Sequence, residues 1–177
     1  MSVRPTTQVG NKVIRAKSKK VAAITATVRR VVQDLTDSMR EVGLVGMAGP
    51  QIGVGLRVFV TEIRKTKARK HIKDFDPLRV FINPKMIKKS KKIVVGYEGC
   101  GSVAHGGLFG EVPRSETVTV SAMGLDGKGF VLNAHGLLAR VIQHEMDHLD
   151  GLVFVDKVAN TKSFMSRAEY IKQRAGK

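Results

Sequence analysis

The clearest hydrophobic pattern in the first third of the chain lies between residues 27 and 42. Apolar side chains recur there at steps of three and four residues, namely Val28, Val31, Val32, Leu35, Met39 and Val42. This is the period of an α-helix with one apolar face. We therefore predict an amphipathic helix whose apolar stripe packs into the core.

A second helical pattern lies in the last third, with apolar residues at Leu137, Leu138, Val141 and Ile142. It predicts a helix that begins at residue 134 or 136 and ends at residue 149. Gly151 is placed to end this helix, because glycine adopts the left-handed conformation that follows many helices. A weaker apolar stripe in residues 163–177 indicates a basic tail or helix. Residues 10–20 are basic, with two interposed apolar residues, and we predict an extended surface arm.

Short runs of β-branched and aromatic residues predict the strands. They cover residues 56–61, 79–82, 93–97, 117–123, 130–133 and 152–155. Asp126-Gly127 is a strong turn signal, so residues 117–123 and 130–133 are expected to form an antiparallel hairpin. We predict an α+β fold in which antiparallel strands surround a central helix that carries His144 and His148, and a single domain spanning residues 1–177.

The composition limits the class of protein. Hydrophobic content of 42% and charged content of 26% are those of a globular chain, and no run approaches the roughly 20 apolar residues that span a bilayer. Cys100 is the single cysteine, which excludes an intrachain disulfide and favours a reducing compartment. The N-terminus has no apolar core of a secretory signal, so we do not expect secretion or a membrane partner.

The chain carries 31 Lys and Arg against 15 Asp and Glu, a formal charge of +16. Such a charge attracts anionic partners but names none of them. Two basic runs are expected to form loops: Arg64, Lys65, Lys67, Arg69, Lys70 and Lys73, then Lys85, Lys88, Lys89, Lys91 and Lys92. If both loops lie on one face, they form a patch for an anionic polymer. Residues 43–55 are rich in glycine, but their spacing fits no nucleotide-binding loop.

Candidate chemistry begins with the HExxH sequence at residues 144–148. His144 and His148 are four residues apart, so both imidazoles can face one metal ion from the same side of a helix. Glu145, beside them, can handle protons. Two surface histidines with a nearby glutamate would be the plain alternative. A catalytic zinc-type centre needs a third protein ligand and an open position for water.

Three positions can be compared for the third ligand. In the metzincin pattern it would fall at Phe154, which cannot bind a metal. Glu169 could serve as in thermolysin-like sites, but its basic surroundings argue against burial beside a metal. Cys100 lies between Gly99 and Gly101, which allow the backbone to approach closely, and a thiolate is a strong ligand for a borderline-soft divalent ion.

Together, three segments resemble the signature motifs of peptide deformylase in order and spacing. They are Gly46-Met47-Ala48-Gly49-Pro50-Gln51-Ile52-Gly53, Glu98-Gly99-Cys100-Gly101-Ser102-Val103 and Gln143-His144-Glu145-Met146-Asp147-His148-Leu149-Asp150-Gly151. The similarity extends from Gly10 to Lys157. Residues 133–136 and 139–142 look most like the organelle-type branch of the family.

The resemblance implies removal of the N-formyl group from the first methionine of new polypeptides, with release of formate. Cys100, His144 and His148 would hold the metal, typically Fe(II), with Zn, Ni or Co able to replace it. Glu145 would act as general base and then acid. The Gln51 side chain and the Gly101 backbone N–H would stabilise the negative charge on the formyl oxygen.

Further residues follow from the same resemblance. The backbone of Val45 and Gly46 would pair with the substrate peptide, and Glu98, Leu137 and Val141 would surround its methionine side chain. The basic tail resembles family segments that dock on the ribosome. The expected location is a bacterial-type cytoplasm or an organelle matrix or stroma, and the expected state is a monomer.

The chain departs from the family pattern at several positions. Leu44 replaces the first glycine of the first motif, Gly49 replaces an alanine, and Gly101 replaces a leucine. The loop over residues 103–111 is about two residues longer than is usual among deformylases, an expectation from motif spacing. Arg140, where many bacterial relatives have an apolar residue, is expected either to narrow the pocket mouth or to reach solvent.

Two other functions remain compatible with these residues. One is a HExxH metallopeptidase that cuts internal peptide bonds. The other is a ribosome-binding or RNA-binding protein built on a degenerate deformylase scaffold. The retention of Cys100, both histidines, Glu145 and Gln51 argues against a degenerate scaffold.

Overall fold

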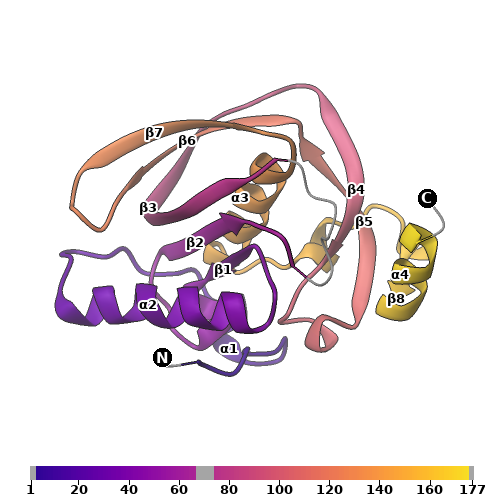
Figure 1. The fold of residues 1–177 in the computed structure, drawn as a ribbon, viewed down its shortest axis with the longest axis horizontal. Coiled ribbons are helices and arrows are strands. Elements are labelled where there is room, and N and C mark those ends of the chain that lie inside the picture. The colour runs from indigo at the N-terminus through magenta and orange to yellow at the C-terminus, as the bar shows by residue number, and fades with distance from the viewer. Residues whose placement is uncertain (1–2, 67–73, 176–177) are drawn as a thin grey trace.

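The structure is a computed structural model that describes residues 3–66 and 74–175. In these residues the strands form two antiparallel sheets, and the predicted α+β class is confirmed (Figure 1). The larger sheet has the order β1 (Gly46–Ala48), β2 (Val58–Ile63), β3 (Asp76–Lys89), β6 (Thr117–Met123) and β7 (Gly129–His135). The smaller sheet has the order β4 (Ile93–Gly99), β5 (Leu108–Ser115) and β8 (Met165–Ser166).

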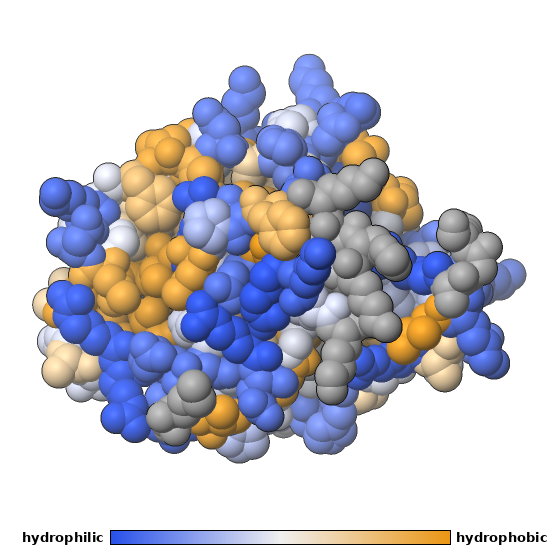
Figure 2. Space-filling model, in the orientation of Figure 1, coloured by the Kyte–Doolittle hydropathy of each residue, from blue (hydrophilic) through white to orange (hydrophobic). Residues whose placement is uncertain are grey.

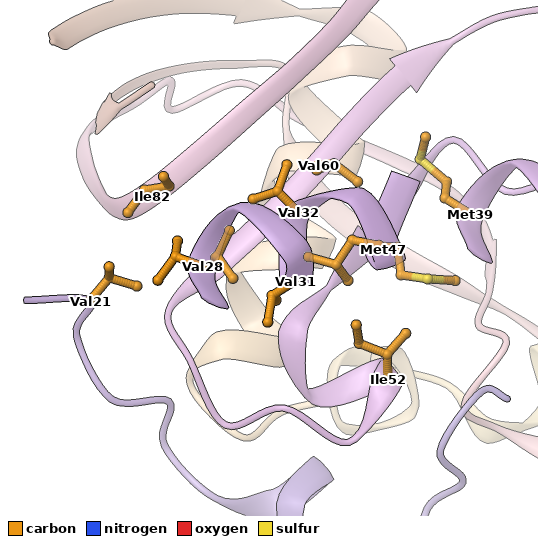
Figure 3. Packing of buried hydrophobic residues seen from close by; sticks show 11 residues of the cluster. Val21, Val28, Val31, Val32, Met39, Met47, Ile52, Val60 and Ile82 are labelled. Atoms are coloured by element: carbon orange, nitrogen blue, oxygen red, sulfur yellow. The ribbon is translucent and has the colours of Figure 1, made fainter. Parts of the chain in front are cut away.

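The predicted N-terminal helix is present as α2 (Ala26–Glu41). Thr25 caps its first turn, since its hydroxyl accepts a hydrogen bond from the Val28 N–H. The apolar stripe packs on one face of the larger sheet, and Figure 3 shows Val28, Val31 and Val32 pointing toward residues of that sheet and of the loop after β1. The 3.6-residue period therefore predicted the helix and its buried face, except at Val42, which follows the last helical residue and is 49% exposed.

The helix with the two histidines is α3 (Gly136–Leu149), and it packs on the opposite face of the larger sheet. Figure 1 shows it enclosed between the two sheets. Phe59 and Phe81 stack against each other on this face, with ring centroids 4.4 Å apart. Gly151 adopts a positive φ of 78° directly after the helix, as predicted. The position of α3 sets the direction in which the motif histidines point.

The predicted hairpin is confirmed as β6 and β7, which pair from Thr117 with His135 to Met123 with Gly129. Gly127 has a φ of 80° in the turn, in agreement with the Asp-Gly signal. Figure 2 shows a largely hydrophilic surface, with a hydrophobic area on its left, between α2 and the β6–β7 hairpin of Figure 1. Among the described residues, no helix has the length and apolar character needed to cross a membrane.

Several predicted strands have different bounds. β2 begins two residues later than predicted, and β3 is far longer than residues 79–82 because it continues as a bent strand through the Asn83-Pro84 break. Lys85, Lys88 and Lys89 therefore lie in β3, not in a loop. Residues 67–73 of the other basic run lie outside the described residues.

Three further predictions were wrong. The predicted loop over residues 103–111 ends earlier, because its last four residues belong to β5 (Leu108–Ser115). The proline of β5 is tolerated because β8 pairs only with Leu108 and Phe109, which leaves Pro113 with one neighbouring strand. Residues 152–155 are not a strand, since a short 3₁₀ helix, η3, covers Phe154–Lys157. The basic arm is not fully extended, because α1 (Lys12–Arg15) inserts Ile14 into the core.

The remaining elements are short. A 3₁₀ helix, η1 (Gly49–Ile52), follows β1, and another, η2 (Ala104–Gly106), precedes β5. A third, η4 (Thr161–Ser163), leads into β8. The predicted C-terminal helix is α4 (Arg167–Ala175), which Figure 1 shows outside the smaller sheet.

Candidate active site

The three predicted metal ligands come together from two elements. Cys100 follows the end of β4, and His144 and His148 lie one turn apart on α3. The ligand atoms of all three residues lie within 4.8 Å of one another, and the Cys100 Sγ is 3.2 Å from the His148 Nε2. Cys100 and His148 are buried. One thiolate and two imidazoles suit a borderline-soft divalent ion, so these residues fit the metal that the motif implies.

The ionisation state of the Cys100 side chain also suits a metal ligand. Burial raises the pKa of Cys100, but the nearby His148 and His144 outweigh this effect and hold the pKa well below the ordinary value of a thiol. The thiolate is the form that ligates metals. Cys100 also accepts a hydrogen bond from the Ser102 N–H at 3.4 Å, which helps to fix its position.

Glu98 orients the first histidine. Its Oε2 lies 2.9 Å from the His144 Nδ1, which leaves the His144 Nε2 for the ion. Arg114 donates to both oxygens of Glu98 at 2.9 Å. Burial raises the pKa of Glu98, but the hydrogen bonds from His144 and Arg114 outweigh it and bring the pKa below its usual range. Glu98 therefore stays an anion that holds His144 in place.

Arg140 does not reach solvent freely, because its side chain is only 16% exposed. Its guanidinium donates to Glu98 Oε1 at 2.8 Å and to the backbone carbonyls of Val94 at 2.7 Å and Val112 at 3.0 Å. The missing side chain of Gly96 makes room for it, because a Cβ there would lie 3.1 Å from Nη2. Arg140 thus joins α3 to the smaller sheet and supports Glu98.

Glu145 is buried beside the three donors, and its Oε2 has no hydrogen-bond partner among the described residues. Burial raises the pKa of Glu145 to about 7. A carboxyl group with such a pKa can both accept and release a proton near neutrality. The backbone of Gly46 lies directly against it, since a Cβ on Gly46 would be 2.4 Å from Oε1. Only glycine allows this approach.

Gln51 lies on η1 and is 1% exposed. Its Oε1 accepts a hydrogen bond from the Ala48 N–H at 2.8 Å, which fixes the direction of the amide. Its Nε2 therefore points toward the metal ligands and lies 3.5 Å from the Cys100 Sγ. A neutral hydrogen-bond donor, the Gln51 amide, thus faces the space beside the three metal ligands.

Gly101 follows Cys100 directly, and its N–H makes no hydrogen bond within residues 3–66 and 74–175. A Cβ on Gly101 would lie 3.3 Å from the Thr6 Cγ2 and 3.4 Å from the Leu44 Cδ1. Two of the departures from the family pattern, Leu44 and Gly101, are therefore neighbours in space. A Cβ at position 101 would be in van der Waals contact with Leu44, so a longer side chain there would meet Leu44.

The third departure, Gly49, also has a structural reason. A Cβ at this position would lie 2.7 Å from the carbonyl oxygens of both Val54 and Leu56. These are backbone atoms, which cannot move aside as the end of a side chain can. The tight turn after η1 therefore requires glycine at position 49.

The predicted substrate residues fall into two groups. Val45 and Val141 belong to one small buried apolar cluster, and Leu137 packs against it half-buried. Gly46 begins β1, the edge strand of the larger sheet. The Glu98 carboxylate is hydrogen-bonded to His144, Arg114 and Arg140. It therefore belongs with the residues that support the metal ligands and not with the apolar cluster.

Sequence patterns missed several residues that build the site. Asp147 accepts a hydrogen bond from Arg114, and the Gln143 side chain bonds the backbone of Ser115 at 2.9 and 3.1 Å, which ties α3 to β5. Gln8, near the N-terminus, bonds the Gly101 carbonyl at 2.8 Å. Asp147 and Gln143 lie within the motif of α3, but no local signal identifies their partners, because each contact joins distant segments.

Comparisons with known proteins agree with this geometry. Residues 3–164 match the family model described as polypeptide deformylase. A peptide deformylase from Thermomicrobium roseum is 40% identical over 160 residues, which are 89% of this chain and 87% of that protein. The Met-Ala-Ser-bound crystal structure of class I type b peptide deformylase from Acinetobacter baumannii is 28% identical, with a TM-score of 0.81 over 88% of this chain and 99% of that one.

A third comparison reaches nearly the whole chain. The crystal structure of a peptide deformylase from Synechococcus elongatus in complex with actinonin has a TM-score of 0.78 and 30% identity, covering 99% of this chain and 90% of that one. The similarity therefore includes the fold, the three motifs and the segments that join them.

Proposed function

The chain belongs to the peptide deformylase family, and from this premise we propose how its own residues release formate from N-formyl-methionyl peptides. It is a metallohydrolase that acts on formylated nascent polypeptides. The observation that carries the residue roles is the grouping of Cys100, His144 and His148, with Glu145 buried beside them and the Gln51 amide directed at Cys100.

Cys100, His144 and His148 would hold the metal ion on which the family depends. We propose Fe(II) as the native ion, with Zn, Ni or Co able to replace it, because a mixed thiolate and imidazole set accepts each of these ions. When bound, such an ion supplies a Lewis acid that lowers the pKa of a water molecule toward neutrality. Glu98 holds His144 in the orientation and tautomer that this ligation needs.

Glu145 takes the proton of the attacking water and gives it to the amine that leaves. Its burial, its free Oε2 and its pKa of about 7 suit both halves of this transfer. As water attacks the formyl carbon, negative charge grows on the formyl oxygen. The Gln51 Nε2 and the Gly101 N–H donate hydrogen bonds to that oxygen and stabilise the charge. Formate and a free amino terminus are the products.

The peptide part of the substrate lies along β1. This strand is at the edge of the larger sheet, so Gly46 can offer backbone groups to an extended peptide on the side away from β2. The Val45 carbonyl instead accepts the Glu62 N–H at 3.0 Å, on the side of β2. The apolar group of Val45, Leu137 and Val141 receives the methionine side chain. The Met-Ala-Ser peptide bound to the Acinetobacter baumannii relative supports a methionyl peptide as ligand.

A formate-release assay with formyl-Met-Ala-Ser tests these roles. The enzyme is purified without oxygen, its metal is identified by elemental analysis, and formate is then measured. We expect Glu145→Gln to keep the metal and lose at least about 100-fold in kcat, because the proton carrier is removed. Cys100→Ser should lose both metal and activity, because it removes the thiolate ligand.

Each outcome separates the competing functions. Intact metal binding in Cys100→Ser would contradict the ligand set and favour a metallopeptidase centre with another third ligand. Cleavage of an internal bond in an unformylated peptide, without formate release, would have the same meaning. No turnover with Fe, Ni, Co or Zn bound would favour a binding protein on a deformylase scaffold.

The basic surface supports a further proposal, that the enzyme binds the ribosome. Exposed basic side chains lie on β3, on the turn to β4 and on α4, as at Lys88, Lys89, Lys91, Arg167 and Arg174. Binding to ribosomal RNA would weaken steeply as salt rises, because bound cations are released from the phosphates. Co-sedimentation with ribosomes between low and moderate salt measures this. Sedimentation that does not change with salt would contradict the proposal.

We propose that residues 1–177 act as one monomeric domain, in a bacterial cytoplasm or in an organelle matrix or stroma. The single cysteine and its role as a thiolate ligand support a reducing location. Sedimentation velocity of the metal-loaded protein tests the monomeric state, and a dimer at micromolar concentration would contradict it.

A further inference from the structure

Residues 7 and 8 contact both residues that are proposed to donate to the formyl oxygen. Thr7 donates its N–H to the Gln51 carbonyl at 2.8 Å, and Gln8 donates its side-chain amide to the Gly101 carbonyl at 2.8 Å. We propose that Gln8 is a positioning residue, which holds the backbone of Gly101 so that its N–H points at the formyl oxygen. This inference rests on the proposed function of Gly101.

The Gln8 side chain makes three hydrogen bonds that span the Gly101 loop. Its Nε2 donates to the Gly101 carbonyl and, at 3.1 Å, to the Thr6 carbonyl. Its Oε1 accepts the N–H of His105 at 3.0 Å. One half-buried amide therefore bonds both ends of the segment from Gly101 to His105, which fixes where that segment begins and where it ends.

This segment needs such support because its conformation is unfavourable. Ala104, His105 and Gly106 follow one another with positive φ angles of 47°, 51° and 77°. For residues with a side chain, the left-handed conformation costs roughly 1 kcal/mol or more each. Gly101 adds a residue of high backbone freedom at the other end. Without the bonds to Gln8, the loop would relax and carry the Gly101 N–H with it.

The neighbouring contacts hold Gln8 itself in place. Val9 donates its N–H to the Ser102 carbonyl at 2.8 Å, which pairs the arm with the loop on the other side of Gln8. Thr6 packs against Gly101, with its Cγ2 3.3 Å from the place of a Cβ. Because Thr7 also bonds the Gln51 carbonyl, residues 6–9 set the separation of the two donors to the formyl oxygen.

The test compares Gln8→Ala and Gln8→Glu with Gln33→Ala, an exposed glutamine on α2 whose amide bonds only Asp37 within the described residues. Gln8→Glu keeps the size and the acceptor for His105, but its carboxylate cannot donate to the Gly101 carbonyl. Removal of one hydrogen-bond donor to the oxygen that gains charge in the transition state costs an enzyme about 100-fold or more in kcat. A displaced Gly101 N–H should therefore lower kcat about ten-fold in both Gln8 variants.

Three readouts accompany kcat. The KM for formyl-Met-Ala-Ser should stay within about two-fold, because the donor acts on charge that grows in the transition state. The metal content should not change, because none of the ligands is touched. Amide hydrogen exchange in residues 101–107 should become faster in both Gln8 variants, as expected when a loop loses its restraints, and should not change in Gln33→Ala.

The outcomes are distinct. A Gln8→Glu variant with the kcat of the unaltered enzyme would overturn the proposal, because the bond to Gly101 would then be dispensable. A rise in KM as large as the fall in kcat, together with loss of metal, would also overturn the proposal, because both are signs of general disruption. Should the unaltered enzyme release no formate, the proposed function fails, while unchanged hydrogen exchange in the variants would overturn the positioning role by itself.

Discussion

At the scale of single residues, the active site depends on space shared between positions that are far apart in the sequence. Leu44 and Gly101 are the case described above, since the Leu44 Cδ1 would lie 3.4 Å from a Cβ on Gly101. Leu44 is half-buried and belongs to the edge of the core under α2. A side chain longer than one Cβ at position 101 would therefore compete with Leu44 for space.

A double-mutant cycle tests this exchange. Gly101→Leu alone should destabilise the protein and lower kcat/KM, because the new side chain meets Thr6 and Leu44. Leu44→Gly alone should also destabilise, by removing buried apolar surface. The two together should recover at least about 1 kcal/mol relative to the sum of the single changes, as contacting residues commonly do. Urea unfolding measures each free energy.

The cycle has a control and a clear contrary result. Val131, on β7, is 67% exposed, and Val131→Gly combined with Gly101→Leu should give an additive effect. If the Leu44→Gly and Gly101→Leu changes also add without recovery, then the two positions do not share one space.

The sequence identifies the site residues whose chemistry is local. The spacing of His144 and His148, with a cysteine between glycines, predicts which residues gather, and the structure brings them together with Gln51. The supporting residues could not be predicted in this way. Gln8 and Gly101 are bonded to each other but are 93 positions apart in the sequence, and Arg140 and Glu98 are 42 positions apart. Such contacts depend on side-chain directions that no local pattern encodes.

At the scale of elements, periodicity predicted the helices better than the strands. α2 and α3 each bury one face, so their period is visible in the sequence. β2 is buried on both faces, with Val58 and Val60 toward α2 and Phe59 toward α3, and it shows no alternation that would fix its bounds. β5 contains glycine and proline, a composition that predicts a loop, and it forms a strand because it pairs with β4 from Phe109 to Ser115.

The turn after η1 gives an element-scale prediction. Gly49→Ala should lower the free energy of unfolding by about 1–3 kcal/mol, because the added Cβ would overlap two backbone carbonyls. It should also reduce kcat, since Gln51 lies in η1 together with Gly49. Thermal or urea unfolding and the formate assay measure the two effects.

Gly129→Ala is the matched control for that change. A Cβ on Gly129 would meet nothing within 4 Å, so alanine there should change the free energy of unfolding by no more than about 0.5 kcal/mol. Equal stability of Gly49→Ala and Gly129→Ala would show that the turn can widen without cost.

At the scale of the whole molecule, the N-terminal arm joins α2 to the active-site loops. Arg4 donates its backbone N–H to the Ser38 hydroxyl at 2.8 Å and its side chain to Asp34 at 3.1 Å. Arg30 also bonds Asp34. Burial raises the pKa of Asp34, but the hydrogen bonds from Arg4 and Arg30 outweigh it and bring the pKa below its usual value.

This ion cluster makes stability depend on pH. Because the folded pKa of Asp34 lies below the unfolded value, about 3.9, its contribution is present above that pH and is lost as the pH falls through the folded pKa. Asp34→Asn should cost about 1 kcal/mol at pH 7, a small value because both arginines are exposed. The gap to the unaltered protein should close below about pH 4. Urea unfolding from pH 7 to pH 3 measures it, and a constant gap would contradict the ion-pair account.

The contacts of the arm also bear on whether the protein acquires metal binding or catalytic activity first during folding. The metal ligands lie within one segment, 48 positions from Cys100 to His148, whereas Gln8 and Gly101 are 93 positions apart. Closing the longer loop costs more chain entropy. A refolding chain that has assembled its ligand set can therefore bind a metal ion while its arm is still free. Metal uptake would precede catalytic activity, and the return of formate release would report the docking of the first ten residues.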